Sequence, residues 1–247
     1  MSLLTATRRA ILPKQYQFTD VPQAEANALI AFYHATDGPN WTASTNWLTD
    51  PLVNNWVGVT AAGGHVTRVE LAANGLDGEG LSALAPLTYL IALYLYSNAD
   101  LSGDIADLSA LILLGYLKID SSSVSGNIDD LSALTLLNSL WLFSTDVSEG
   151  TIGTMTRMST CRVQDCGWAQ AAVDTFIDDL WTRRDDFTDA TPELNIGGNN
   201  AAPSGVYQNT CAPTTPLEKI YNLTHAQCGG DTFQTWTAIV WNGGSAP

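Results

Sequence analysis

One spacing of apolar residues recurs along this chain and constrains its fold more than any other feature. In each copy apolar residues stand at positions 1, 4 and 6, and a small polar residue follows three residues later. Copies begin at residues 66, 90, 114, 137 and 158, and a looser sixth copy begins at 191. A unit of about 20 to 30 residues cannot bury its apolar edge alone, so self-similarity at this period indicates a solenoid whose units share one core.

Each copy has the alternation of a short β-strand. Positions 4 and 6 then point inward, and positions 3, 5 and 7 point outward. The small polar residue stands where the chain leaves the strand, and there a buried side chain can satisfy backbone groups that no strand reaches. We expect these residues to stack in one column: Asn74, Asn98, Ser122, Thr145, Cys166 and Asn199.

On these residues the chain resembles the leucine-rich repeat family. The second half of each unit, Leu-Ser-Gly-Asp-Ile at 101–105 and Val-Ser-Gly-Asn-Ile at 124–128, is similar to the plant-type variant, although the following proline is missing. The resemblance implies an α/β solenoid with a curved parallel sheet on the concave face and a second short strand on the convex side. The repeats are expected to span residues 65–200.

The segment before the repeats, residues 23–64, resembles the helical amino-terminal cap of that family. Residues 25–33 have helical spacing, and Trp41, Trp47 and Trp56 follow. Plant-type caps carry a disulfide around this last motif, whereas Asn54 and Ala61 occupy the corresponding positions here. The tryptophans are therefore expected to close this end by packing alone.

The carboxy-terminal cap is expected over residues 201–247, as a helix plus a strand. A 3.6-residue period predicts a helix over 168–184, before the cap, and Thr215-Pro-Leu-Glu218 predicts the start of a helix through about residue 223. Residues 232–241 alternate as a strand that would cover the sheet edge. This tail is similar to the ending of repeat proteins from bacterial and phage genomes.

The four cysteines fall into two pairs. Cys161 and Cys166 take an inward and a column position, so we expect buried thiols, and no second pair with zinc spacing supports a metal site. Cys211 and Cys228 lie outside the repeats. They form a disulfide in an oxidising compartment and remain free thiols otherwise, and the sequence leaves both alternatives open.

Charge and hydropathy limit the partners. The chain has 25 acidic and 10 basic residues, a net charge of −15, which disfavours nucleic acid and anionic membranes. No apolar run is long enough for membrane insertion. Residues 1–13 do not have the order of a secretory signal. Residues 1–22 are expected to form an anchoring arm that contacts a neighbouring subunit.

The outward strand positions give the candidate binding site. Aromatic residues gather there on coils two to four, and charged residues would form a polar rim. The predicted ligand-binding residues are Tyr94, Tyr96, Tyr116, Lys118, Asp120, Trp141, Phe143 and Arg162. Exposed aromatic patches usually mark interaction sites, so a protein or glycan is the expected partner. The alternative is that these aromatics suit strands and pack only on each other.

Catalytic signals are missing from the sequence. The three histidines lie in separate segments, and no nucleophile, phosphate-loop, dinucleotide or metalloprotease motif occurs, so no enzyme and no cofactor is expected. The leading hypothesis is a binding or assembly module, a structural component of a virion, tail appendage or other extracellular assembly. The alternative is a secreted or cell-surface receptor-like protein that binds peptides or carbohydrates.

Overall fold

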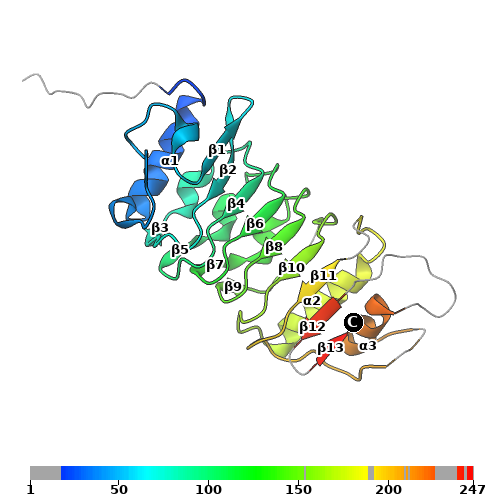
Figure 1. The fold of residues 1–247 in the computed structure, drawn as a ribbon. Coiled ribbons are helices and arrows are strands. Elements are labelled where there is room, and N and C mark those ends of the chain that lie inside the picture. Colours follow the sequence, from blue (N-terminus) through cyan, green and yellow to red (C-terminus); the bar gives the residue numbers. More distant parts are fainter. Residues whose placement is uncertain are drawn as a thin grey trace, which may run out of the picture.

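The computed structural model describes residues 18–152, 154–188, 192–208, 210, 212–225, 238–241 and 244–246. Within them, a nine-stranded sheet runs along an elongated molecule (Figure 1). Its strands, in spatial order, are β1 (Val59–Ala62), β2 (His65–Glu70), β4 (Ala92–Tyr94), β6 (Tyr116–Lys118), β8 (Ser139–Trp141), β10 (Thr160–Arg162), β11 (Glu193–Asn195), β12 (Ala238–Trp241) and β13 (Gly244–Ala246). The expected parallel sheet is confirmed, because every pair from β2 to β12 is parallel.

The strands pair in the register that the repeat predicts. The residues at position 4 of successive coils are partners across the sheet, and all of them are buried: Val69, Leu93, Leu117, Leu140, Cys161, Leu194 and Ile239. A continuous apolar core behind the sheet follows from this register, and burial of such side chains drives the fold.

The second half of the early coils forms a smaller parallel sheet. Its strands are β3 (Gly78–Glu79), β5 (Leu101–Asp104), β7 (Ser123–Asn127) and β9 (Asp146–Ser148). Short 3-10 helices follow the first three of them: η3 (Leu81–Leu84), η4 (Ile105–Leu108) and η5 (Ile128–Leu131). The second short strand implied by the plant-type resemblance is therefore present.

The column of small polar residues satisfies backbone groups, as expected. The Asn98 side-chain oxygen accepts hydrogen bonds from the backbone N–H groups of Asn74 (2.9 Å) and Leu76 (3.1 Å). Its amide nitrogen donates to the carbonyls of Leu71 (3.0 Å) and Leu95 (2.7 Å). The Ser122 and Thr145 hydroxyls each donate to the carbonyl three residues earlier. In each coil one side chain thus forms hydrogen bonds with the backbone groups at the turn, which have no partner on a neighbouring strand.

The column assignment of Asn199 is wrong. Asn199 is exposed, and Asn200 takes the position: its oxygen accepts from the N–H groups of Cys166 (3.1 Å) and Trp168 (3.0 Å). The last coil has one more residue between strand and column than the others, with Gly198 in the left-handed region at φ 70°. The earlier coils have a positive φ at the same distance after position 6, on Ala73, Ser97, Ser121, Ser144 and Asp165. The extra residue is therefore Asn199, which stands between this turn residue and the column and moves the asparagine by one.

The tryptophans close the amino-terminal end, beside α1 (Gln23–Ala35) and the 3-10 helices η1 (Gly38–Asn40) and η2 (Val53–Asn55). Trp41, Trp47 and Trp56 are buried, and each indole N–H donates to a backbone carbonyl. Between the two positions where plant-type caps have cysteines, the Ala61 N–H donates to the Asn54 side-chain oxygen at 2.7 Å. A hydrogen bond therefore links the positions that lack a disulfide.

The described part of the expected arm packs on this same end. The Asp20 carboxylate accepts hydrogen bonds from the N–H groups of Val53 (3.1 Å) and Asn54 (2.8 Å). Phe18 packs edge-on against Trp56, with ring centroids 5.7 Å apart. Residues 18–22 thus contact their own chain, and residues 1–17 lie outside the described residues.

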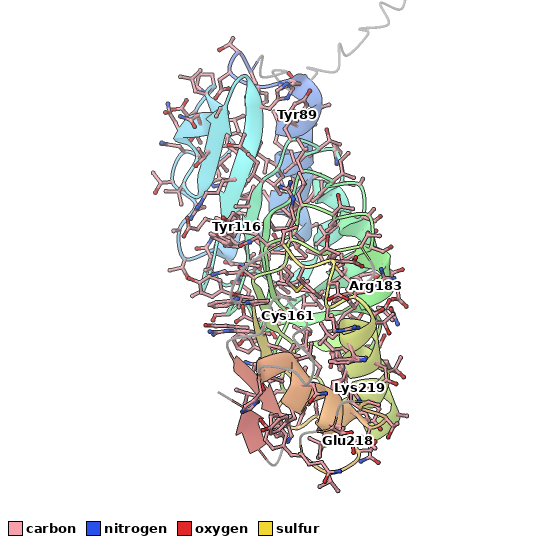
Figure 2. All side chains as sticks on the ribbon, turned by 90° about the vertical axis from the view of Figure 1, so that its right-hand side faces the viewer. Tyr89, Tyr116, Cys161, Arg183, Glu218 and Lys219 are labelled. Atoms are coloured by element: carbon pink, nitrogen blue, oxygen red, sulfur yellow. The ribbon has the colours of Figure 1, made fainter. Side chains whose placement is uncertain are left out.

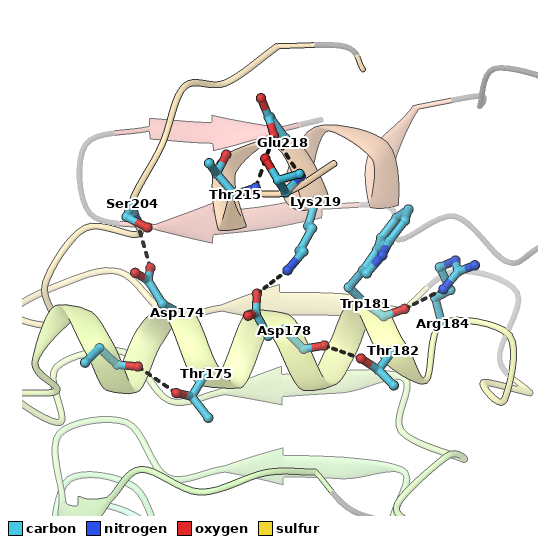
Figure 3. A network of polar contacts seen from close by, with 12 residues as sticks. Asp174, Thr175, Asp178, Trp181, Thr182, Arg184, Ser204, Thr215, Glu218 and Lys219 are labelled. Atoms are coloured by element: carbon cyan, nitrogen blue, oxygen red, sulfur yellow. Dashed lines mark hydrogen bonds and ion pairs between the residues drawn. The ribbon is translucent and has the colours of Figure 1, made fainter. Parts of the chain in front are cut away.

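Two helices cover the other end. After β9 the outer side of the coil is α2 (Gln170–Thr182), which packs on α3 (Pro216–Thr224). Lys219 Nζ donates to Asp178 Oδ1 at 2.7 Å, and the Ser204 N–H donates to Asp174 Oδ1 at 2.8 Å (Figure 3). The capping box that opens α3 is present as predicted, between Thr215 and Glu218. Cys211 and Cys228 lie outside the described residues, as does the predicted strand before Ala238.

In the part of the chain that the structure describes, no helix has the length and apolar character that a membrane span requires.

Candidate binding face of the parallel sheet

The outward side chains at position 5 form one continuous row. Pairing places Glu70, Tyr94, Lys118, Trp141 and Arg162 next to one another on consecutive strands. Strand neighbours are about 4.8 Å apart, so these side chains are in contact range. From Tyr94 onward the row alternates an aromatic ring with a cation.

Each ring of the row stands between two cations. The Tyr94 ring lies 4.6 Å from the Arg68 guanidinium and 5.3 Å from Lys118 Nζ, measured to its centroid. The Trp141 ring lies 3.6 Å from Lys118 Nζ and 4.4 Å from the Arg162 guanidinium. Cations attract the electron-rich face of a ring, so the contacts stabilise both partners. We call Arg68, Tyr94, Lys118, Trp141 and Arg162 the cation–aromatic ladder.

The ladder changes the expected character of the site. The sequence predicted a patch of aromatic rings with charges at its rim. The structure instead places the charges between the rings, where they cover the faces of Tyr94 and Trp141. The sequence left two interpretations open: that the aromatic residues bind a partner, or that they only pack on each other. An arrangement in which the rings pack on neighbouring side chains and the cations remain at the surface agrees with both.

Tyr116 is the most exposed of the predicted aromatics, at 41%. Its neighbours at position 3 are Ala92 and Ser139, which are small and buried, so the ring stands above them. Figure 2 shows Tyr116 on the side of the molecule opposite to Arg183, which ends α2. Tyr96 and Phe143 are half-buried, and Phe143 lies 6.2 Å from Trp141 between ring centroids.

Asp120 does not lie on the rim as predicted: it is 3% exposed. Tyr96 and Phe143 occupy the same position on the adjacent coils, and these large side chains flank the shorter carboxylate. Burial raises the pKa of Asp120 to about 6, while hydrogen bonds from its own backbone N–H and the charge of Lys118 act in the opposite direction. Its Oδ1 has no hydrogen-bond partner among the described residues.

Burial also changes the proton affinity of the ladder. It lowers the pKa of the Lys118 ammonium, which loses water between the rings. Burial likewise raises the pKa of Tyr94. By contrast, the hydrogen bond to Glu70 raises the pKa of Arg68, whose guanidinium lies 2.6 Å from that carboxylate.

Apolar side chains at the turns before the strands extend this face, and the sequence analysis missed them. Ile91 and Ile112 are about half exposed, and Tyr89 and Leu113 are exposed as well. They precede β4 and β6, and the Ile91 carbonyl accepts a hydrogen bond from the Tyr116 N–H at 3.1 Å. Their signal in the sequence is an apolar residue within two positions of the inward position 1, where the repeat does not require one.

A cavity adjoins the end of the ladder. It has a volume of ≈ 190 Å³ and is lined by Arg162, Glu193, Asn195, Val240 and the strand residues Cys161 and Leu194. Cys161 is buried, and Cys166 is partly exposed with its thiol donating to the Leu142 carbonyl. Burial raises the pKa of both thiols, so they stay protonated and unreactive.

Among the described residues, no group of histidine, cysteine, aspartate and glutamate side chains is arranged to hold a metal ion. His65 is engaged in the amino-terminal end, where its Nδ1 lies 2.6 Å from Glu25 Oε1 and its ring stacks on Tyr89. The side chains that the face presents are cations, aromatic rings and hydroxyl groups.

Comparison with known proteins supports the fold. No protein-family model matches the sequence, and no curated protein matches it either. Among solved structures, a plant ice-binding protein is 19% identical, with a TM-score of 0.61 over 74% of this chain and 57% of that chain. PEPR1, solved with AtPEP1, is 18% identical, with a TM-score of 0.55 over 71% of this chain and 26% of that chain.

The LRR ectodomain of the receptor kinase SOBIR1 from Arabidopsis thaliana is also similar, at 22% identity and a TM-score of 0.44, over 57% of this chain and 77% of that chain. The chain thus spans little more than half of the ice-binding protein and about a quarter of PEPR1. The repeat period and the parallel sheet, together with the likeness to the ice-binding protein and to PEPR1, support a leucine-rich-repeat-like fold. Identities this low concern the fold alone.

Proposed function

We propose that the chain is a non-enzymatic protein-binding module, and that the outward face of the parallel sheet is where it binds. The observation that carries the proposal is the cation–aromatic ladder with Tyr116 beside it on one continuous face. Tyrosine, tryptophan and arginine are the residues most often responsible for binding energy at protein interfaces. PEPR1, which has a similar fold, is solved together with AtPEP1, which agrees with this use of the fold.

We further propose that the module belongs to a larger extracellular assembly such as a phage virion or tail appendage. In this proposal residues 1–17 contact a neighbouring subunit, and residues 18–22 attach this arm to the tryptophan cluster through Asp20 and Phe18. The second candidate is a secreted or cell-surface receptor-like protein that binds peptides or carbohydrates, and the likeness to PEPR1 is the observation in its favour.

A random-peptide display selection on the purified protein tests the binding role. Selected peptides should lose binding to Tyr116→Ala and Trp141→Ala, because both side chains lie on the proposed face. Ser125→Ala is the matched control, because Ser125 is exposed on β7 of the smaller sheet. Circular dichroism of each variant verifies folding. Selected peptides that bind all variants equally would place binding elsewhere and refute the proposal.

Deleting residues 1–17 distinguishes a component of a larger assembly from a receptor-like protein. The deletion keeps the contacts of Asp20 and Phe18, so the module should fold and still bind its selected peptides. If the module is an assembly component, the deleted protein should fail to enter particles or higher oligomers, as seen by sedimentation. Unchanged sedimentation alongside the full chain would favour the receptor-like role.

A further inference from the structure

The rings of the ladder are not free to stack on a ligand. Lys118 and Arg162 come from the strands on either side of Trp141, and both cations lie over its ring. Tyr94 is covered in the same way by Arg68 and Lys118. A sugar that recognises aromatic rings needs an open face, and these two rings have none. What the ladder presents to a partner is positive charge held in place by the rings.

Two of these cations have no ion pair within 4 Å among the described residues. Most other basic side chains of the described residues lie within 4 Å of a carboxylate, as in the pairs of Arg68 with Glu70, Arg183 with Asp179 and Lys219 with Asp178. Lys118 and Arg162 form no such ion pair within the described part of the chain, and the buried Asp120 carboxylate acts on both from a greater distance. On a protein whose net charge is −15, an unpaired cation pair on a sheet face is a local exception.

The pair offers hydrogen-bond donors to anionic groups. Lys118 Nζ lies 3.6 Å and the Arg162 guanidinium carbon 4.4 Å from the centroid of the Trp141 ring, which stands between them. Carboxylates beside the indole can accept a hydrogen bond from each cation. Such charge-assisted hydrogen bonds are about twice as strong as neutral ones.

Exposed apolar side chains also lie on this face. Tyr116 is exposed on the strand that carries Lys118, and Ile91 and Ile112 are exposed at the turns before β4 and β6. Beside Arg162, Val240 and Asn195 line the ≈ 190 Å³ cavity. Glu193 lines it too and repels anions, so the carboxylates of a partner are expected beside Trp141 rather than in the cavity.

We infer that the partner of this face is an acidic and apolar peptide segment, with aspartate or glutamate carboxylates bound at Lys118 and Arg162 and an apolar side chain on Tyr116. The inference rests on the proposed protein-binding function and specifies the chemistry of the partner. A peptide combines carboxylates with apolar side chains at short spacing, as the face requires, whereas an acidic polysaccharide supplies the charge without the apolar groups.

Fluorescein-labelled ten-residue peptides of alternating glutamate and leucine, glutamine and leucine, or lysine and leucine provide the test by fluorescence polarisation. The glutamate peptide should bind at least about tenfold more tightly than the glutamine peptide. Its affinity should fall as salt is added, because salt screens the interaction between charges. The double variant Lys118→Gln and Arg162→Gln should lose this preference. Arg157→Gln is the matched control, because it removes one charge from an exposed position outside the ladder and should change binding less than about twofold.

A charge-conserving variant guards against misfolding. Lys118→Arg with Arg162→Lys keeps both charges and should retain the preference for glutamate, even if the neutral double variant is destabilised. Equal binding of the three peptides, no binding of the glutamate peptide, or a glutamate preference that survives loss of both cations would overturn the inference. Polygalacturonate that binds more tightly than the peptide through the same two residues would also overturn it, in favour of an acidic glycan.

The outcome is separable from that of the display selection. Selected peptides that depend on Tyr116 and Trp141 but show no acidic preference would refute the inference and leave the protein-binding function intact. Peptides that ignore the face altogether would refute the function itself.

Discussion

Replacing the buried carboxylate of Asp120 with an amide, Asp120→Asn, should make the protein more stable at neutral pH. Burial holds the pKa of Asp120 at about 6, against 3.8 for the free side chain. The folded state therefore binds the proton more tightly than the unfolded state does. The two pKa values correspond to about 3 kcal/mol of unfolding free energy that the wild type loses when the carboxylate ionises.

The sign of the pH dependence follows from proton binding. Between pH 4 and 6 the unfolded chain releases the Asp120 proton first, so the folded state holds more protons and its stability falls as the pH rises. Asparagine does not titrate, and its unmet amide hydrogen bonds cost about 1 kcal/mol. The variant should thus be more stable than the wild type by about 1–3 kcal/mol above pH 6, and the advantage should disappear toward pH 4.

Urea unfolding followed by tryptophan fluorescence, at intervals from pH 4 to 8, measures the difference directly. The decisive quantity is the difference in unfolding free energy between wild type and variant, because the other carboxylates contribute equally to both. Asp146→Asn is the control: Asp146 is exposed on β9, and its replacement should change stability by less than about 0.5 kcal/mol throughout. A difference that does not depend on pH, or a variant less stable at pH 8 than at pH 4 relative to wild type, would refute the reasoning.

Two further predictions concern the polar groups that stabilise the coils. Asn98→Ala should lower the unfolding free energy by about 3 kcal/mol or more, because four backbone groups lose their hydrogen-bond partners. Ser122→Ala should lower it by only about 1 kcal/mol, because a single backbone carbonyl loses its partner. Chemical denaturation measures both values, and equal losses would contradict this explanation. Hydrogen bonds from Gln208 and from the Thr214 and Thr215 N–H groups lower the pKa of Glu218 to about 2, so the stability it gives is present above pH 4.5 and is lost as the pH falls toward 2. Glu218→Gln should therefore lower the melting temperature at pH 7 and remove that part of the acid sensitivity, and a variant with the wild-type melting profile would show that the capping box contributes nothing.

The parallel sheet could be predicted because its signal is local and repeated. Leu93, Leu117 and Leu140 recur at one register, and a one-residue slip of a strand would turn them all to solvent. The helices were predictable for the same reason, since α2 has a continuous apolar face and α3 begins with a capping box. The prediction that Asn199 belongs to the polar column was wrong because a fixed spacing cannot detect an inserted residue between the strand and the column.

The candidate site was predicted only as a set of positions. Outward alternation identifies which residues share the face, but it says nothing of how long side chains arrange themselves on it. Lys118 and Arg162 can extend to water or fold onto Trp141, and the choice depends on neighbouring strands rather than on local sequence. The burial of Asp120 likewise depends on the size of its neighbours in other coils, Tyr96 and Phe143, 24 and 23 residues away.

On the outer side of the molecule the strands of the smaller sheet give way to the helix α2, and this change affects the curvature of the large sheet on the inner side. Strands of the smaller sheet are about 4.8 Å apart, whereas a helix is about 10 Å wide, yet β8, β10 and β11 on the inner side keep strand spacing. Where α2 takes the place of a strand such as β9, neighbouring coils must therefore lie farther apart on the outer side than on the inner side, which bends the inner sheet. The ≈ 190 Å³ cavity lies between β10, β11 and β12, opposite this widening. Replacing α2 with a short strand like β9 would thus reduce the curvature of the inner face without touching any residue on it.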